Sequence, residues 1–177
     1  MHSHELEDLT LLLVRDADEA EMWIDRWTLS YPTVCTAAAA RSQSIPEWQN
    51  TIERAWRTVH SRNAAIVAHG AGVSAVVAWL YRADAATLRR VRNIILAAPL
   101  AAAFPDDAEH TLQRARCPCP AALVIGRNDP ACPQDWAQRQ AALWRATLLR
   151  APQSGRLNGP MQGWQRGMKL MQEMLLS

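Results

Sequence analysis

The sequence predicts a three-layer α/β/α sandwich with a mainly parallel sheet, formed as a single domain by residues 1–177. Short apolar runs alternate along the chain with longer amphipathic runs, which is the pattern of repeated βαβ units. The apolar runs are continuous, so both faces of the expected strands are buried, as in a parallel sheet. No repeat, low-complexity tract or linker divides the chain, and 177 residues are enough for one well-packed domain.

Six apolar runs are expected to form the strands, and the helices between them have recognisable ends. The strands are expected at residues 9–14, 33–38, 64–68, 93–98, 121–125 and 146–151. The first helix is expected in "AEMWIDRW" (20–27), capped by Asp16 or Asp18. Ser44 and Glu47 form a capping-box pattern before the next helix, at 48–59. Pro133 suits the first turn of a helix over 133–144.

The last helix, over about 160–176, carries an apolar stripe that we interpret as a docking face: Met168, Leu170, Met171, Met174 and Leu175. Two tryptophan pairs lie at helical spacing, Trp23 with Trp27 and Trp48 with Trp56, and are expected to anchor their helices to the sheet.

Composition and charge exclude several functional classes. Residues 1–30 hold eight acidic residues and two arginines, whereas the remainder holds nine acidic and 17 basic residues. These bases are scattered and never interleave with aromatic residues, so we expect no nucleic-acid partner. No apolar run is long enough to cross a bilayer and no signal peptide is visible, so we expect no membrane partner and a cytoplasmic location. The four cysteines are expected to be reduced, and neither cysteines nor histidines have metal-ligand spacing. No metal or other cofactor is expected.

The stretch "IVAHGAGVSAVVAWLY" (66–81) has the pattern of a strand, a sharp glycine turn and a helix. In open α/β sheets, ligands bind beyond the carboxyl ends of the strands, which places this turn at the expected site. Gly70, Gly72 and Ala75 match the dinucleotide fingerprint G-x-G-x-x-G/A only formally, because the acidic residue that this fold places at the end of the next strand is missing. The nearest acid, Asp84, comes too early.

The alternative interpretation of this turn is the nucleophile elbow, G-x-S-x-G. Motifs along the rest of the chain favour this interpretation. Five stretches follow one another along the chain: "MWIDRWTLSYP" (22–32), "IPEWQNTIERAW" (45–56), "AHGAG" (68–72), "LVIGRNDPACP" (123–133) and "SGRLNGPMQGW" (154–164). Their order and spacing resemble the small single-domain serine hydrolases of the retinoblastoma-binding-protein-nine type, an α/β-hydrolase family. In this resemblance the first stretch is similar to the segment after the family's first strand, the second to its next helix and the third to its elbow. The last two are similar to the segments that carry the triad aspartate and histidine.

The resemblance implies a Ser–Asp–His triad with an oxyanion hole, and it places the nucleophile at Gly70, the acid at Asp129 and the base at Arg156. Only the acid is retained. Glycine has no attacking group, and arginine stays protonated and cannot accept a proton from a serine. The family's glycine-rich first loop is replaced by the acidic "VRDADEAEMW" (14–23). If the fold is kept, we expect an Arg156–Asp129 ion pair, with geometry suited to a bidentate contact.

Three functional hypotheses remain open. The favoured one is a degenerate hydrolase that binds a small molecule or a protein partner in the former crevice, near Arg15, His69 and Ala71, without turnover. The second is an active, esterase-like hydrolase with a rearranged nucleophile. Cys132, after the Asp129 turn, is the candidate nucleophile, because Ser74 lies one helical turn from Gly70 and is not expected to reach the crevice. His69 is interpreted as a packed histidine. The third is a scaffold or oligomeric interaction protein. A crevice filled by protein side chains would favour this third hypothesis.

Overall fold

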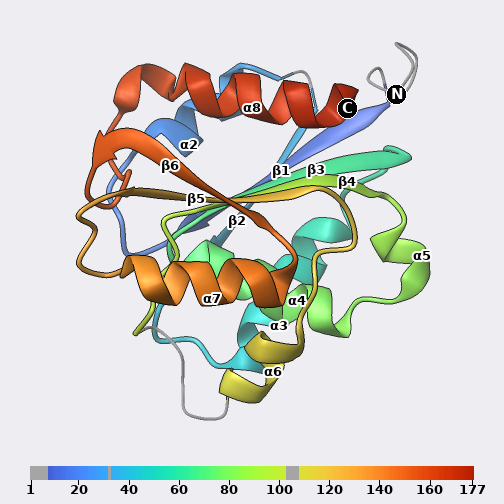
Figure 1. Ribbon diagram of the computed structural model, residues 1–177. Coiled ribbons are helices and arrows are strands. Elements are labelled where there is room, and N and C mark those ends of the chain that lie inside the picture. Colours follow the sequence, from blue (N-terminus) through green and yellow to red (C-terminus); the bar gives the residue numbers. More distant parts are fainter. Residues whose placement is uncertain (1–7, 32, 103–107) are drawn as a thin grey trace.

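The computed structural model describes residues 8–31, 33–102 and 108–177, and these form a parallel six-stranded sheet between two helical layers (Figure 1). The strand order is β2-β1-β3-β4-β5-β6, and every neighbouring pair is parallel. The strands are β1 (Leu9–Asp16), β2 (Val34–Ala39), β3 (Asn63–His69), β4 (Val91–Ala97), β5 (Ala121–Arg127) and β6 (Thr147–Ser154). All six expected strands are therefore confirmed, and their carboxyl ends meet at one edge of the sheet.

The helices lie on both faces of this sheet (Figure 1). One face is covered by α3 (Ile45–Trp56), α4 (Ala71–Arg82), α6 (Ala108–Arg114) and α7 (Gln134–Trp144), and the other by α2 (Trp23–Arg26) and α8 (Gln165–Leu176). The short helix α5 (Ala85–Leu88) and two 3₁₀ turns, Trp27–Leu29 and Met161–Gly163, complete the described elements. The predicted three-layer α/β/α architecture is confirmed.

Several predicted helix ends are confirmed and others are wrong. The Ser44–Glu47 capping box is present, with each side chain accepting a hydrogen bond from the other residue's backbone N–H. The first helix is much shorter than expected, because Asp16 still belongs to β1 and Asp25 accepts the hydrogen bond of the Met22 N–H at the true helix start. The last helix begins five residues late, after the 3₁₀ turn.

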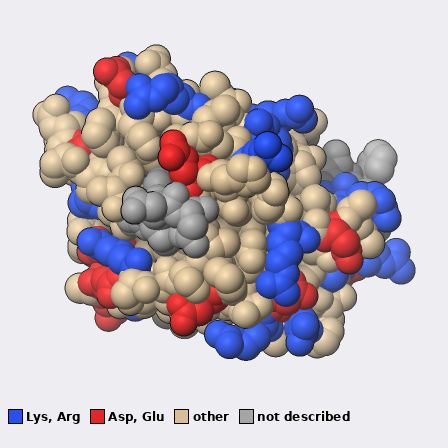
Figure 2. All heavy atoms as spheres, turned by 90° about the horizontal axis from the view of Figure 1, so that it is seen from below, with Lys and Arg blue, Asp and Glu red and all other residues tan. Residues whose placement is uncertain are grey.

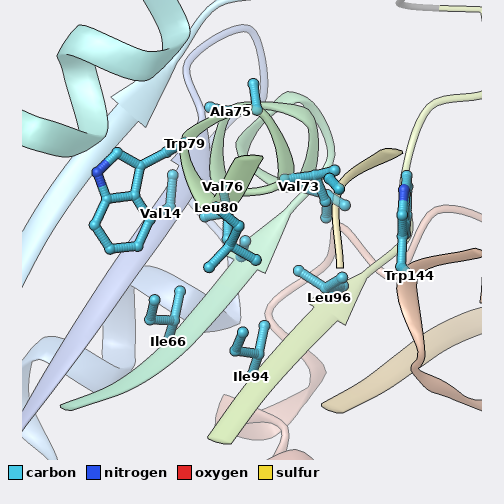
Figure 3. Close-up of a cluster of buried hydrophobic side chains, with 14 of the residues drawn as sticks. Val14, Ile66, Val73, Ala75, Val76, Trp79, Leu80, Ile94, Leu96 and Trp144 are labelled. Atoms are coloured by element: carbon cyan, nitrogen blue, oxygen red, sulfur yellow. The ribbon is translucent and has the colours of Figure 1, made fainter. Parts of the chain in front are cut away.

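The core is divided by the sheet into two clusters. Figure 3 shows part of the cluster beneath α3, α4 and α7, where Val76 and Leu80 of α4 lie over Ile66 and Ile94 of the two central strands. The second cluster lies between the sheet and the α2 and α8 layer. The expected stripe on α8 contributes to it, with Met171 and Leu175 buried and its remaining members partly buried. The two expected tryptophan pairs are buried as well: Trp23, Trp27, Trp48 and Trp56.

The outer surface of the α3–α7 layer carries basic side chains in several separate groups, with acidic side chains between them (Figure 2). No described helix combines the length and the apolar character that a bilayer crossing requires.

Candidate active site

The turn after β3 has the geometry of a strand-to-helix elbow. β3 ends at His69 and α4 begins at Ala71, so Gly70 alone makes the turn. Its backbone lies at φ 58° and ψ −125°, in the left-handed half of conformational space that side chains rarely adopt. The Gly70 N–H donates to the Ala97 carbonyl, and the Gly70 carbonyl accepts from the Val73 N–H. This hydrogen bonding fixes the direction in which a side chain at position 70 would point.

That direction is occupied by Asp16, the last residue of β1. A Cβ atom added to Gly70 would lie 2.9 Å from Asp16 Cβ and 3.1 Å from Asp16 Cγ, and closer still to Asp16 Oδ2. Oδ2 accepts a 2.9 Å hydrogen bond from the N–H of Ala71, the first residue of α4. The Asp16 side chain is completely buried. The carboxylate therefore fills the volume of a side chain at position 70 and uses the free N–H that follows it.

Further contacts hold Asp16 in this place. Its Oδ1 accepts a 2.9 Å hydrogen bond from the Asp18 N–H, and Arg41 Nε lies 3.3 Å from Oδ2. The Arg41 guanidinium also pairs with Glu19 at 2.9 Å, and Glu19 accepts a hydrogen bond from the Asn158 side chain. The segment after β1 is thus tied to the loops after β2 and β6. Because a buried carboxylate needs such partners, the network stabilises this closed arrangement.

The expected ion pair between Arg156 and Asp129 is present. Arg156 Nη1 lies 2.7 Å from Asp129 Oδ2, and the Asp129 side chain has no exposed surface. The contact uses one guanidinium nitrogen, so the expectation of a bidentate pair is wrong. The physical reason is that Arg156 Nη2 donates to the Ala98 carbonyl at 2.6 Å, while Asp129 Oδ1 accepts from the Ala131 N–H. Arg156 Nη1 also donates to the Pro99 carbonyl at 3.2 Å. The guanidinium therefore joins the ends of β4 and β5 to the loop after β6.

His69 is a packed histidine, as the sequence interpretation favours. Its ring is buried, and Nε2 lies 2.8 Å from the Arg156 carbonyl oxygen. Since a carbonyl only accepts, Nε2 is the protonated nitrogen, and Nδ1 has no hydrogen-bond partner among the residues that the structure describes. Burial lowers the pKa of His69 below its ordinary value, so the ring is neutral at physiological pH. The side chain fastens the Arg156 loop to the elbow.

The other sequence candidates are placed less centrally. Arg15 lies on the opposite face of β1 from Asp16, where its guanidinium donates to the Glu19 and Ala20 carbonyls and approaches Asp25. The structure does not bring it together with Gly70. The Ser74 hydroxyl is fully buried in α4. Burial raises the pKa of the Cys132 thiol to about 12, which removes the thiolate needed for attack at neutral pH.

Two pockets adjoin these residues. A cavity of about 490 Å³ begins at Asp129 and Cys132 and extends between the end of β5, the start of α7 and the middle of β6. A smaller one, of about 290 Å³, lies beside Arg15 and Asp25 on the α2 face. Within the described ranges, no group of three or more His, Cys, Asp or Glu residues is arranged to hold a metal ion.

Comparison with known proteins decides the family. The model of the serine hydrolase family matches residues 15–173, which is most of the chain and includes the elbow, Asp129 and Arg156. The chain belongs to the serine hydrolase family. No curated protein matches its sequence significantly.

Solved structures of hydrolases share the fold of this serine hydrolase family member. A protein of Pectobacterium atrosepticum described as a YdeN-like hydrolase aligns with 98% of this chain and 94% of its own, with 19% identity and a TM-score of 0.77. The ydeN gene product of Bacillus subtilis aligns over 93% of this chain and 98% of its own, with 13% identity and a TM-score of 0.67. The carboxylesterase CesB of the same species aligns over 91% of this chain and 82% of its own, with 13% identity and a TM-score of 0.60. At these identities the likeness establishes the α/β-hydrolase fold.

In this family member, the site combines residues that sequence reasoning found and one whose role it missed. The contacts of His69 and Arg156 link the elbow at Gly70 and Ala71 to Asp129. Asp16 was expected to cap the first helix, yet it fills the elbow. The available signal was strand alternation, because Val14 and Asp16 lie on the same face of β1 and Val14 packs directly beneath α4.

Proposed function

We propose that this member of the serine hydrolase family does not hydrolyse esters through an acyl-enzyme, and that it functions by binding a small molecule or a protein partner beside the former catalytic centre. Within the family, the order of its motifs supports placing it with the retinoblastoma-binding-protein-nine type, as a member with a degenerate triad.

The observation that carries this proposal is the position of the Asp16 carboxylate. In the serine mechanism, a side chain at position 70 attacks the acyl carbon, and the N–H of the next residue stabilises the oxyanion that develops. Here Asp16 fills the first position and its Oδ2 accepts the Ala71 N–H of the second. A carboxylate already bound to that donor excludes a substrate carbonyl from the same place and repels a developing negative charge.

The base position supports the same conclusion. A histidine there would alternate between neutral and protonated forms during one reaction cycle. Arg156 remains protonated throughout and donates to Asp129 and to two backbone carbonyls. The guanidinium therefore holds three segments together and has no means of taking up a proton from a nucleophile.

The position of the nucleophile is filled by Asp16, which by the criterion above favours a scaffold or interaction protein. The cavity beside Asp129 is open, however, and binding is proposed there. The cavity of about 490 Å³ next to Asp129 falls within the range of small-molecule sites. It lies beyond the carboxyl end of β5, where open α/β sheets place their ligands.

Intact-protein mass spectrometry tests the catalytic half of this proposal. Purified protein is incubated with a fluorophosphonate and, separately, with p-nitrophenyl butyrate, and a family member with an intact triad serves as the positive control. We expect no mass increase with either reagent. A stoichiometric adduct that maps to one residue would contradict the proposal and identify the nucleophile.

One observation favours a second candidate, hydrolysis with Asp16 as the rearranged nucleophile. Carboxylates serve as nucleophiles in some enzymes, and Asp16 is the side chain that occupies the nucleophile's place. Its attack on an ester carbonyl would give a mixed anhydride and release the alcohol, and water would then regenerate the carboxylate. This candidate requires ester turnover that disappears in Asp16→Asn. The buried, hydrogen-bonded state of Asp16 favours the binding proposal instead.

A further inference from the structure

The cavity beside Asp129 has an uncompensated positive charge. Arg127, at the end of β5, and Arg150, in β6, both line it, and both side chains are exposed to solvent. Neither has an ion pair or a side-chain hydrogen bond with any residue in the described ranges, whereas the carboxylate of Asp129 is already paired with Arg156. The cavity walls thus carry two free guanidinium groups and no free acid.

The two arginines lie on the same side of the sheet. Arg150 is the register partner of Ile125, and alternation from Leu148, which packs in the α7-side cluster, puts Arg150 on that side. A register shift separates Ile125 from Arg127, and Arg127 is placed on this side because it lines the same cavity. The two guanidinium groups therefore reach one cavity from neighbouring strands.

The remaining walls suit the rest of a small anionic molecule. Gln134, the first residue of the 11-residue helix α7, lines the cavity, and Pro133 before it provides no side-chain cap. The positive end of the helix dipole adds to the attraction for an anion, and Asp135 in the first turn of α7 offsets part of it. Ile125, Cys132 and Pro133 line the cavity on its less polar side, against which an organic body can pack.

We infer that this cavity binds a small organic molecule that carries a carboxylate or a phosphate, with Arg127 and Arg150 pairing with its oxyanion. The inference rests on the proposed binding function and names its site and its ligand class. The planar guanidinium of arginine can donate two parallel hydrogen bonds to a carboxylate or a phosphate, and these charge-assisted bonds are stronger than hydrogen bonds between neutral groups. The volume of about 490 Å³ accommodates a molecule of one or two rings.

Calorimetric titration of the full chain at low salt tests the inference with three probes of similar shape: phenyl phosphate, benzoate and the neutral amide benzamide. We expect at least one of the two anions to bind at millimolar concentration or below and benzamide not to bind. A preference between phenyl phosphate and benzoate separates the phosphate class from the carboxylate class. Failure of both anions to bind, or equal binding of benzamide, would overturn the inference.

Variants locate the site. Arg127→Gln and Arg150→Gln should each weaken anion binding by about tenfold, because each removes one charge-assisted contact. Arg139→Gln is the matched control, since Arg139 is an exposed arginine on α7 that does not line the cavity. Equal affinity in all three variants would place the anion elsewhere and refute the assignment.

The same samples separate this inference from the proposed function. Ester turnover by the wild-type protein would contradict the non-hydrolytic proposal, whatever the result of the anion titrations. Absent anion binding in a protein without turnover would refute only the present inference.

Discussion

A serine at position 70 is sterically incompatible with the present position of Asp16, and this incompatibility can be measured. The substitution Gly70→Ser restores the nucleophile of the family but adds a Cβ 2.9 Å from Asp16 Cβ, a separation that real Cβ atoms essentially never show. Rotation of the carboxylate cannot relieve this contact, because it involves the first atom of the Asp16 side chain. The backbone of β1 or of the elbow has to shift.

The expected loss of stability has two parts. A side chain at φ 58° costs about 1–3 kcal/mol in backbone strain. Overpacking a well-filled interior costs about 1–3 kcal/mol more. Gly70→Ser should therefore lower the free energy of unfolding by roughly 2–6 kcal/mol.

A double-mutant cycle in urea separates these two parts. Gly163→Ser is the strain control, because Gly163 has φ +76° and no atom within 4 Å of an added Cβ. The Asp16→Gly background removes the Cβ of residue 16 and with it the steric contact. In this background, the loss of unfolding free energy caused by Gly70→Ser should be smaller by about 1–3 kcal/mol and should equal the loss caused by Gly163→Ser. Equal costs of Gly70→Ser in both backgrounds would refute the reasoning that Asp16 occupies the side-chain position of residue 70.

Three further predictions concern stability, each measured by urea unfolding. Arg156→Gln should lower the free energy of unfolding by about 3–5 kcal/mol, because it leaves the buried Asp129 carboxylate without its ion-pair partner. A loss below about 1 kcal/mol would contradict a stabilising role for this buried ion pair. Stability should fall as the pH drops below about 6.5, because the unfolded chain protonates His69 while burial lowers the pKa of His69 in the folded state. His69→Gln should flatten this fall in stability below about pH 6.5, and an unchanged slope would contradict the prediction. Ser44→Ala should lower the free energy of unfolding by about 1 kcal/mol, because it removes the N-terminal cap of α3. An unchanged free energy of unfolding would show that Glu47 alone is enough to start the helix.

Strands and strongly capped helices could be predicted from the sequence because their signals are local. The four inner strands, β1, β3, β4 and β5, are almost wholly buried, and burial on both faces of a parallel sheet requires their nearly continuous apolar composition. The edge strands β2 and β6 are more exposed and have shorter apolar runs. The start of α3 is determined by Ser44 and Glu47, three residues apart, with no help from the rest of the fold. Helix α2 was predicted incorrectly because its few residues are stabilised by tertiary packing, with Trp23 and Trp27 buried against Trp164.

The candidate site was predictable in part for a similar reason. Gly70, Asp129 and Arg156 occupy motif positions, so the order of motifs identifies them. The role of Asp16 depends on the parallel pairing of β1 with β3, which aligns Val14 with Ala68 and brings the next residues of both strands to the same edge. That alignment arises from contacts between distant segments, so the sequence alone could not show it. The acidic first loop indicated only that negative charge would lie near the elbow. The single-nitrogen contact of Arg156 likewise depends on the Ala98 carbonyl, which belongs to another strand end.

Steady-state hydrolysis of p-nitrophenyl acetate tests the central claim most directly. The wild-type protein should hydrolyse this activated ester no faster than an equal concentration of its Asp16→Asn variant, with no saturation and no burst of p-nitrophenol, because the nucleophile position and the oxyanion donor are both occupied by Asp16. Saturable turnover that survives repurification and disappears in Asp16→Asn would contradict the account and make Asp16 a catalytic residue.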